Sequence, residues 1–228
     1  MHCAGTSPKL PALQDMRMNE RRSALGGATF LVLFVIHRIL QGLGPASPAD
    51  ATAYYVEHKT ALTVSELAVG LALLAFLAFL APLIATIWRS GAQVHALVTL
   101  IAGTVFIAMG YASMAAESAL IAVAGAPEGG ADQALYQLQA RIPVIFTIAA
   151  LALTISWSGL RTGLLPRGLN VAGLIVGGFF LLGSALSVLG DTPEGRSSVA
   201  GIAVYVAWMG AVCGALWQRG RPRADDFE

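Results

Sequence analysis

Long apolar runs separated by short polar segments make up most of the chain. Six of these runs reach the roughly 20 residues that an α-helix needs to cross about 30 Å of hydrocarbon. Backbone groups cannot stay unpaired in lipid, and the short alternating segments typical of a barrel are missing, so each run predicts a helix. We therefore expect an all-α membrane protein, a bundle of six transmembrane helices. The predicted spans are Ala24–Leu43, Leu62–Trp88, Val94–Ala124, Ile142–Leu160, Gly168–Leu189 and Val199–Trp217.

The composition agrees with a chain that has lipid as its solvent. Of the 228 residues, 56% are hydrophobic and 12% are charged, against roughly 25% charged residues in a soluble domain. So few charges argue against an ordinary soluble enzyme, a disordered chain or a nucleic-acid binder, and two cysteines argue against a disulfide scaffold. We expect one transmembrane domain over residues 24–218, a disordered cytoplasmic lead over 1–23 and a cytoplasmic tail over 219–228.

Basic residues predict the orientation, because cytoplasmic loops carry an excess of Lys and Arg. With both termini in the cytoplasm, ten of the 14 basic residues lie inside. We expect a multi-pass protein of the inner (plasma) membrane in that orientation. A cleaved signal peptide at the first run is the alternative, but that run is long and contains His37-Arg38. The inside group is Lys9, Arg17, Arg21, Arg22, Arg89, Arg161, Arg167, Arg219, Arg221 and Arg223.

Two features of the external loops predict local structure. The sequence Ser47-Pro48-Ala49-Asp50 is typical of a helix start, with Ser as cap and Pro in the first turn. A short helix through Tyr54, Tyr55 and Glu57 should follow and lie near the headgroups, where Tyr is favoured. In the fourth span, Pro143 is compatible with a helix that begins or bends there.

Ionisable residues inside the spans are costly in lipid and therefore candidates for a site. In the first span His37, Arg38 and Gln41 share one helix face. Glu66 lies one turn into the second span, Glu117 lies near the outer end of the third, and Arg141 opens the fourth. All of them lie at the same outer level. We therefore predict a polar binding cluster of His37, Arg38, Gln41, Glu66, Glu117 and Arg141.

The cluster has two interpretations. Its members form an ion-paired outer vestibule inside the bundle, or each side chain reaches the outer headgroups by itself. We favour an internal pair of Arg38 with Glu66 or Glu117, and solvation at the headgroups for Asp191 and Arg196. Such a pair can also be purely structural, because removing one partner would leave the other buried and uncompensated.

The sequence offers no pattern for a cofactor, and we expect none. His37 and His95 lie at opposite ends of their spans, which argues against a bis-histidine haem, and no lysine lies at mid-membrane for a retinal Schiff base. A His-Glu-x-x-His zinc helix, a Gly-x-Ser-x-Gly elbow and a phosphate loop are missing from the sequence. A metal held by His37, Glu66 and Glu117 is the weaker alternative, because Arg38 next to them disfavours a cation.

Two sequence patterns concern helix contacts and family. Gly173-x-x-x-Gly177 and Gly210-x-x-x-Gly214 allow close helix approach, which we interpret as packing within one chain rather than dimerisation. The stretch Ser158-Gly159-Leu160-Arg161-Thr162-Gly163-Leu164-Leu165-Pro166-Arg167-Gly168-Leu169 precedes a Gly-rich helix. It resembles bacterial six-helix integral membrane proteins catalogued as a domain of unknown function. The resemblance implies a six-span layout and no particular activity.

Three functions fit these observations. The leading hypothesis is a non-enzymatic accessory, sensory or regulatory membrane protein. The second is a small transporter or permease component with an outward-facing polar vestibule. The third is an intramembrane lipid-modifying enzyme in which His37 and Glu66 or Glu117 act as acid and base. The expected partners are the lipid bilayer and an unidentified membrane protein or small ligand, with no nucleic acid; the oligomeric state stays open.

Overall fold

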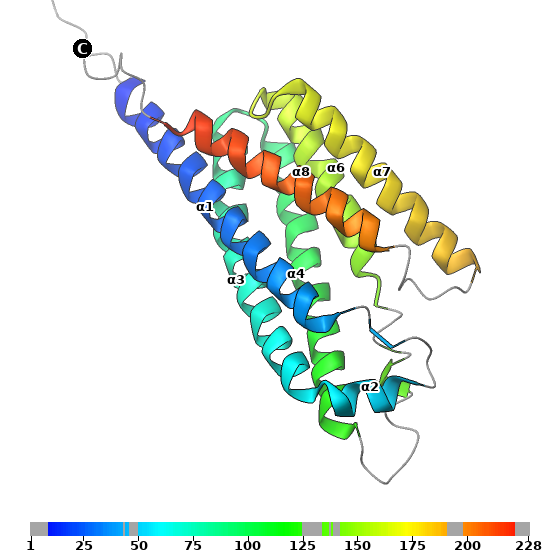
Figure 1. The fold of residues 1–228 in the computed structure, drawn as a ribbon. Helices are drawn as coiled ribbons and strands as arrows, with labels where there is room; N and C mark the ends of the chain where they lie inside the picture. Colours follow the sequence, from blue (N-terminus) through cyan, green and yellow to red (C-terminus); the bar gives the residue numbers. More distant parts are fainter. Residues whose placement is uncertain are drawn as a thin grey trace, which may run out of the picture.

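The computed structural model describes residues 9–42, 44–45, 50–124, 134–136, 138, 142–190 and 198–221. Within these ranges the chain is all-α, without strands (Figure 1). The helices are α1 (Lys9–Gln41), α2 (Ala51–Glu57), α3 (Lys59–Arg89), α4 (Gln93–Val123), α6 (Val144–Thr162), α7 (Arg167–Gly190) and α8 (Ser198–Arg219).

Six of these helices are long and apolar enough to cross a membrane, and each coincides with one of the six predicted spans. The chain is therefore a multi-pass membrane protein. The short α2 confirms the helix predicted through Tyr54 and Tyr55, and α6 begins at Val144, directly after Pro143. The predicted cap residue Ser47 and the charged pair Asp191 and Arg196 lie outside the described residues.

The beginning of α1 corrects the expectation of a disordered lead. The helix starts at Lys9 rather than Ala24, so residues 9–23 of the predicted lead are helical. This segment is held by tertiary contacts: Glu20 is paired with Arg219 of α8, and Ser23 donates a hydrogen bond to the Phe79 carbonyl of α3 (2.7 Å). Hydropathy cannot detect such contacts, because they join residues far apart in the sequence.

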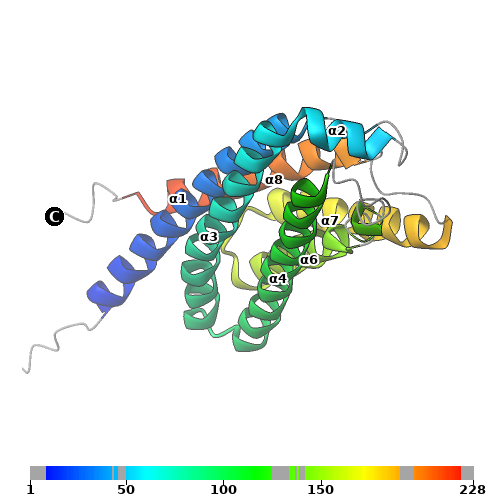
Figure 2. The same cartoon turned by 90° about the horizontal axis from the view of Figure 1, so that it is seen from below.

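The six spanning helices form a closed ring in which each helix packs against its neighbours in the chain, and α8 packs against α1 (Figures 1 and 2). Short connections between antiparallel helices favour this order. The start of α1 and the end of α8 lie at one end of the ring, which we call the terminal end. The opposite end carries α2, and we call it the loop end (Figure 1).

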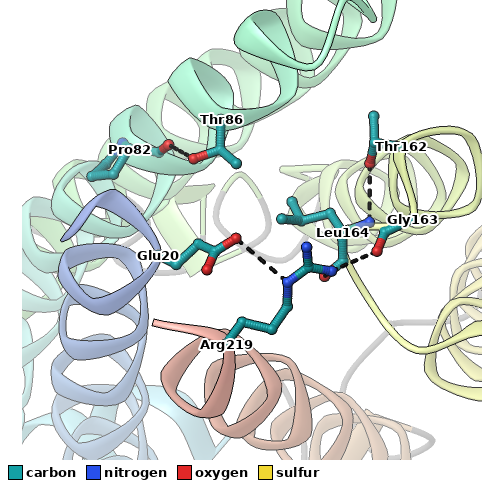
Figure 3. A network of polar contacts seen from close by, with 7 residues as sticks. All are labelled: Glu20, Pro82, Thr86, Thr162, Gly163, Leu164 and Arg219. Carbon is teal, nitrogen blue, oxygen red and sulfur yellow. Dashed lines mark hydrogen bonds and ion pairs between the residues drawn. The ribbon is translucent and has the colours of Figure 1, made fainter. Parts of the chain in front are cut away.

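Charged and polar contacts join three parts of the chain at the terminal end. The Arg219 guanidinium lies 3.4 Å from the Glu20 carboxylate and also donates to the carbonyls of Gly163 (2.5 Å) and Leu164 (2.8 Å) in the α6–α7 turn (Figure 3). Arg21 lies 4.8 Å above the ring of Trp217. These contacts hold the start of α1 and the end of α8 against the α6–α7 turn, because one planar guanidinium donates to several acceptors at once.

Glycines allow the helices to approach closely. A Cβ atom on Gly26 of α1 would lie 2.5 Å from the backbone nitrogen of Phe79 in α3, so only glycine fits there. In α7, Gly173 and Gly177 pack against α6 residues of the same chain, as predicted. A Cβ on Gly214 would meet no atom within 4 Å, so the second glycine pair is not a tight contact.

Candidate functional site

The ring encloses a cavity of about 300 Å³ in its loop-end half. This volume lies at the lower end of the range found for small-molecule sites, which are concave and mostly apolar with a few converging polar groups. All six spanning helices contribute to its lining. Its polar side chains are His37, Arg38, Gln41, Glu66, Ser113, Glu117 and Tyr136.

The opposite wall of the cavity is aromatic and aliphatic. Phe30, Phe34 and Phe106 line it, and Phe30 and Phe106 pack edge to face with centroids 6.3 Å apart. Phe76 fills the space between them and is fully buried. The remaining apolar lining comes from Val69, Leu73, Met114, Ile142, Val144, Ile145, Ile148, Phe180 and Ile202. The cavity is therefore amphipathic, with its charges at one end.

Two carboxyl groups from neighbouring helices meet at the polar end. Glu66 of α3 and Glu117 of α4 are 8% and 4% exposed, and their carboxyl groups interact with each other. Ser118 donates a hydrogen bond to Glu66 Oε2 (3.2 Å), whereas Glu66 Oε1 is buried and has no hydrogen-bond partner among the described residues. Two adjacent carboxylates repel each other and favour sharing a proton or a cation.

Arg38 is linked to this pair through an amide side chain. Arg38 donates to Gln41 Oε1, and Gln41 Nε2 donates to both oxygens of Glu117 (2.8 and 3.0 Å). The predicted internal pairing of Arg38 with a carboxylate therefore takes an indirect form. Because the amide orients between a donor and an acceptor, the three side chains form one connected unit that joins α1 to α4.

His37 is held by the neighbouring helix. The Ser65 hydroxyl donates to the His37 carbonyl (3.0 Å) and lies 2.7 Å from Nδ1 of the His37 ring. Its only hydrogen is then in use, so Nδ1 carries the ring hydrogen and also points to the Ser65 carbonyl (3.2 Å). His37 thus bonds Ser65 rather than either carboxylate, which removes the main support for an acid–base pair of His37 with Glu66 or Glu117.

The short helix α2 covers the cluster at the loop end. Tyr55 is 3% exposed, and its hydroxyl interacts with the Glu117 carboxyl; Tyr54 donates to the Gln41 carbonyl. Burial raises the pKa of both tyrosine hydroxyls above the usual value of 10. The apolar cluster of Ala51, Tyr55, Leu62, Leu120 and Ile121 fixes α2 in this position.

The structure brings together five of the six predicted site residues. His37, Arg38, Gln41, Glu66 and Glu117 all line the one cavity, and Arg141 lies outside the described residues. The sequence interpretation missed the roles of Ser65, Ser118 and Tyr55. The two serines could have been found from their positions next to the glutamates, since Ser65 precedes Glu66 and Ser118 follows Glu117.

No group of three or more His, Cys, Asp or Glu residues with a metal-binding arrangement occurs among the described residues. Comparison of the chain with protein-family models, curated proteins and solved structures finds no match. The function of the chain is therefore inferred from the cavity and its side chains.

Proposed function

We propose that this protein is a non-enzymatic, membrane-embedded binding protein for a small amphipathic molecule that bears a cationic or hydrogen-donating head. In this proposal the head lies beside Glu66 and Glu117, and the apolar body extends toward Phe30 and Phe106. The ligand gives the bundle an accessory, sensory or regulatory role. We also propose that the protein lies in the inner (plasma) membrane with both termini in the cytoplasm, and that it is related to the six-helix family.

The single observation that carries the proposal is the charge imbalance at the polar end of an apolar cavity. Among the described residues, two interacting carboxyl groups face one guanidinium, and one of their oxygens receives no hydrogen bond. Lipid makes an uncompensated charge costly. A proton, or the positive head of a ligand, is the complement that this arrangement lacks.

The apolar wall supports the rest of the ligand's chemistry. A simple metal ion would gain nothing from Phe30, Phe34 and Phe106, whereas an aromatic or aliphatic body would bury against them. A cationic head close to an aromatic face is further stabilised by the ring quadrupole. The expected ligand class is therefore a small hydrophobic amine rather than an inorganic ion.

The proposal is tested with 4-phenylbutylamine as the probe and the purified protein in detergent. Calorimetric titration should show saturable binding, weakened at least about tenfold in Glu66→Gln and Glu117→Gln, since each tenfold change corresponds to the loss of one modest charge contact. Glu57→Gln removes an exposed acid from α2 at the same end and should bind like the wild type. Equal binding of 4-phenylbutyrate, or unchanged binding in both cavity variants, contradicts the proposal.

The second candidate function is a small transporter or permease component, and a specific feature favours it. All six spanning helices line the cavity, so a relative movement of helices would change its access. Proteoliposomes that contain the wild-type protein should then release 4-phenylbutylamine along its gradient, and Glu66→Gln or Glu117→Gln should abolish that flux. Binding without flux supports the sensory role, and wild-type flux in both variants excludes this cavity as the pathway.

A further inference from the structure

A second hollow lies at the terminal end of the bundle, on the opposite side from the ligand cavity. It has a volume of about 550 Å³ and lies around the turn between α6 and α7. Its lining combines two arginines with an aromatic ring and the backbone of the turn. The residues that line it include Trp157, Leu160, Arg161, Gly163, Arg167 and Asn170.

The two arginines in this hollow carry unused charge. Arg161 and Arg167 are both exposed, and Arg161 lies 5.4 Å above the Trp157 ring. Among the described residues neither of them pairs with an acidic side chain, whereas Arg219 at the same end is paired with Glu20. Two guanidinium groups that flank one concave surface suit a phosphate, which accepts several charge-assisted hydrogen bonds.

An apolar groove continues from the hollow along the helices. It has a volume of about 540 Å³ between α4, α6 and α7, and its lining includes Val98, Leu153 and Leu174. Trp157 belongs to both the hollow and the groove and is 49% exposed. Tryptophan is favoured at the boundary between headgroups and acyl chains, because its ring is apolar and its N–H is polar.

We propose that the hollow and the groove together form a site for one anionic phospholipid of the leaflet at the terminal end. The phosphate lies between Arg161 and Arg167, and one acyl chain passes Trp157 and lies in the groove. The charge of the arginines selects the headgroup, and the continuous apolar groove selects a lipid over a free phosphate. This inference is independent of the ligand cavity, since it uses different residues at the other end of the bundle.

The test is native mass spectrometry of the full-length protein in detergent, with dioleoyl-phosphatidylglycerol as the probe. The wild type should retain one lipid molecule, and the double variant Arg161→Gln/Arg167→Gln should bind it about thirtyfold more weakly, given the contribution of each basic side chain near an anionic surface. Arg89→Gln is the matched control, because Arg89 is an exposed arginine at the same end in the α3–α4 turn. It should bind like the wild type.

A second variant tests the groove and does not depend on the arginines. Val98→Trp places a large side chain from α4 into the groove, and Val98 is 46% exposed, so the substitution has room at the bundle surface. It should weaken phosphatidylglycerol binding and leave the melting temperature of the lipid-free protein unchanged. Equal weakening by Arg89→Gln, equal retention of dioleoyl-phosphatidylcholine, full competition by inorganic phosphate, or a dimer that covers the groove without lipid would each overturn the proposal.

Discussion

The two ends of the bundle each bury carboxylate, but they balance its charge differently. At the terminal end, Glu20 has Arg219 in direct contact, and the same guanidinium also serves two carbonyls of the α6–α7 turn. At the loop end, Arg38 is the arginine that the described residues place near Glu66 and Glu117, and it is linked to Glu117 through Gln41. Among the described residues, the buried acid at the terminal end has a base in direct contact, whereas the two acids at the loop end have no arginine in direct contact.

Packing differs in the same direction. At the middle of α1, this helix and α3 lie so close that Gly26 contacts the backbone of α3. In the loop-end half the helices leave a cavity of about 300 Å³. The Glu20–Arg219 pair shows that this chain can place a buried acid in direct contact with a base, and natural sequences depart from such consistency mainly at functional sites. The imbalance at the loop end therefore marks the site.

The largest expected effect distinguishes the packing of the two halves. Gly26→Ala places a Cβ atom 2.5 Å from backbone of α3, which cannot yield as a side chain can, and should cost about 3 kcal/mol of stability. Gly70→Ala near the cavity meets only the flexible Met114 side chain at 3.3 Å and should cost less than about 1 kcal/mol. Reversible unfolding by denaturant in mixed micelles measures both, and equal costs would refute the difference in packing.

The next effect tests the closed network at the terminal end. Arg219→Gln removes the ion pair with Glu20 and the donors to Gly163 and Leu164, so it leaves a buried carboxylate without its partner. Because the arginine side chain is itself 44% exposed, we expect a loss of about 2 kcal/mol rather than the larger cost of a fully buried pair. Arg219→Lys restores the positive charge but not the planar set of guanidinium donors, so it should recover part of the lost stability. A wild-type unfolding midpoint in Arg219→Gln contradicts this.

A third pair of variants compares the acids directly. Glu20→Gln should destabilise the fold by about 1 kcal/mol, since it weakens a satisfied ion pair. Glu66→Gln removes one of two interacting carboxyl groups and should leave stability within about 0.5 kcal/mol of the wild type, or raise it. The unfolding free energies of the two variants, measured side by side, check this. If Glu66→Gln is the more destabilising of the two, the loop-end acids are structural.

The smallest effect concerns the covering helix α2. Burial raises the pKa of Tyr54 and Tyr55, so these hydroxyls stay protonated where an exposed tyrosine ionises near pH 10. The stability that depends on them is complete below pH 10 and decreases as the pH rises above it. Absorbance titration of the folded protein should therefore show the same tyrosinate signal near pH 10 in the wild type and in Tyr55→Phe. A smaller signal in the variant would mean that α2 does not seal the cluster.

Hydropathy and charge predict much of this molecule, because the bilayer imposes length and composition on every span. The six spans, the helix α2 and the meeting of His37, Arg38, Gln41, Glu66 and Glu117 follow from local patterns. Polar and ionisable side chains at one membrane level are costly in lipid, so they meet in the bundle interior.

The remainder depends on contacts between distant residues. The start of α1 packs on the end of α8 through Glu20 and Arg219, and no window of local sequence contains both residues. The burial of Tyr55 depends on Leu120 and Ile121 of α4, which lie far from it in the sequence. The order of helices around the ring is likewise set by side-chain packing rather than by hydropathy.

The most direct test of the binding cavity is a crystal structure of the protein with 4-(4-bromophenyl)butylamine, in which anomalous scattering locates the bromine. The bromine should lie against the cavity faces of Phe30 and Phe106 with the amine beside Glu66 and Glu117, and Glu66→Gln crystals soaked in the same way should show no such peak. Bromine found only on the lipid-facing surface, or found equally in the cavity of both proteins, would contradict the claim that the two carboxyl groups form a ligand site.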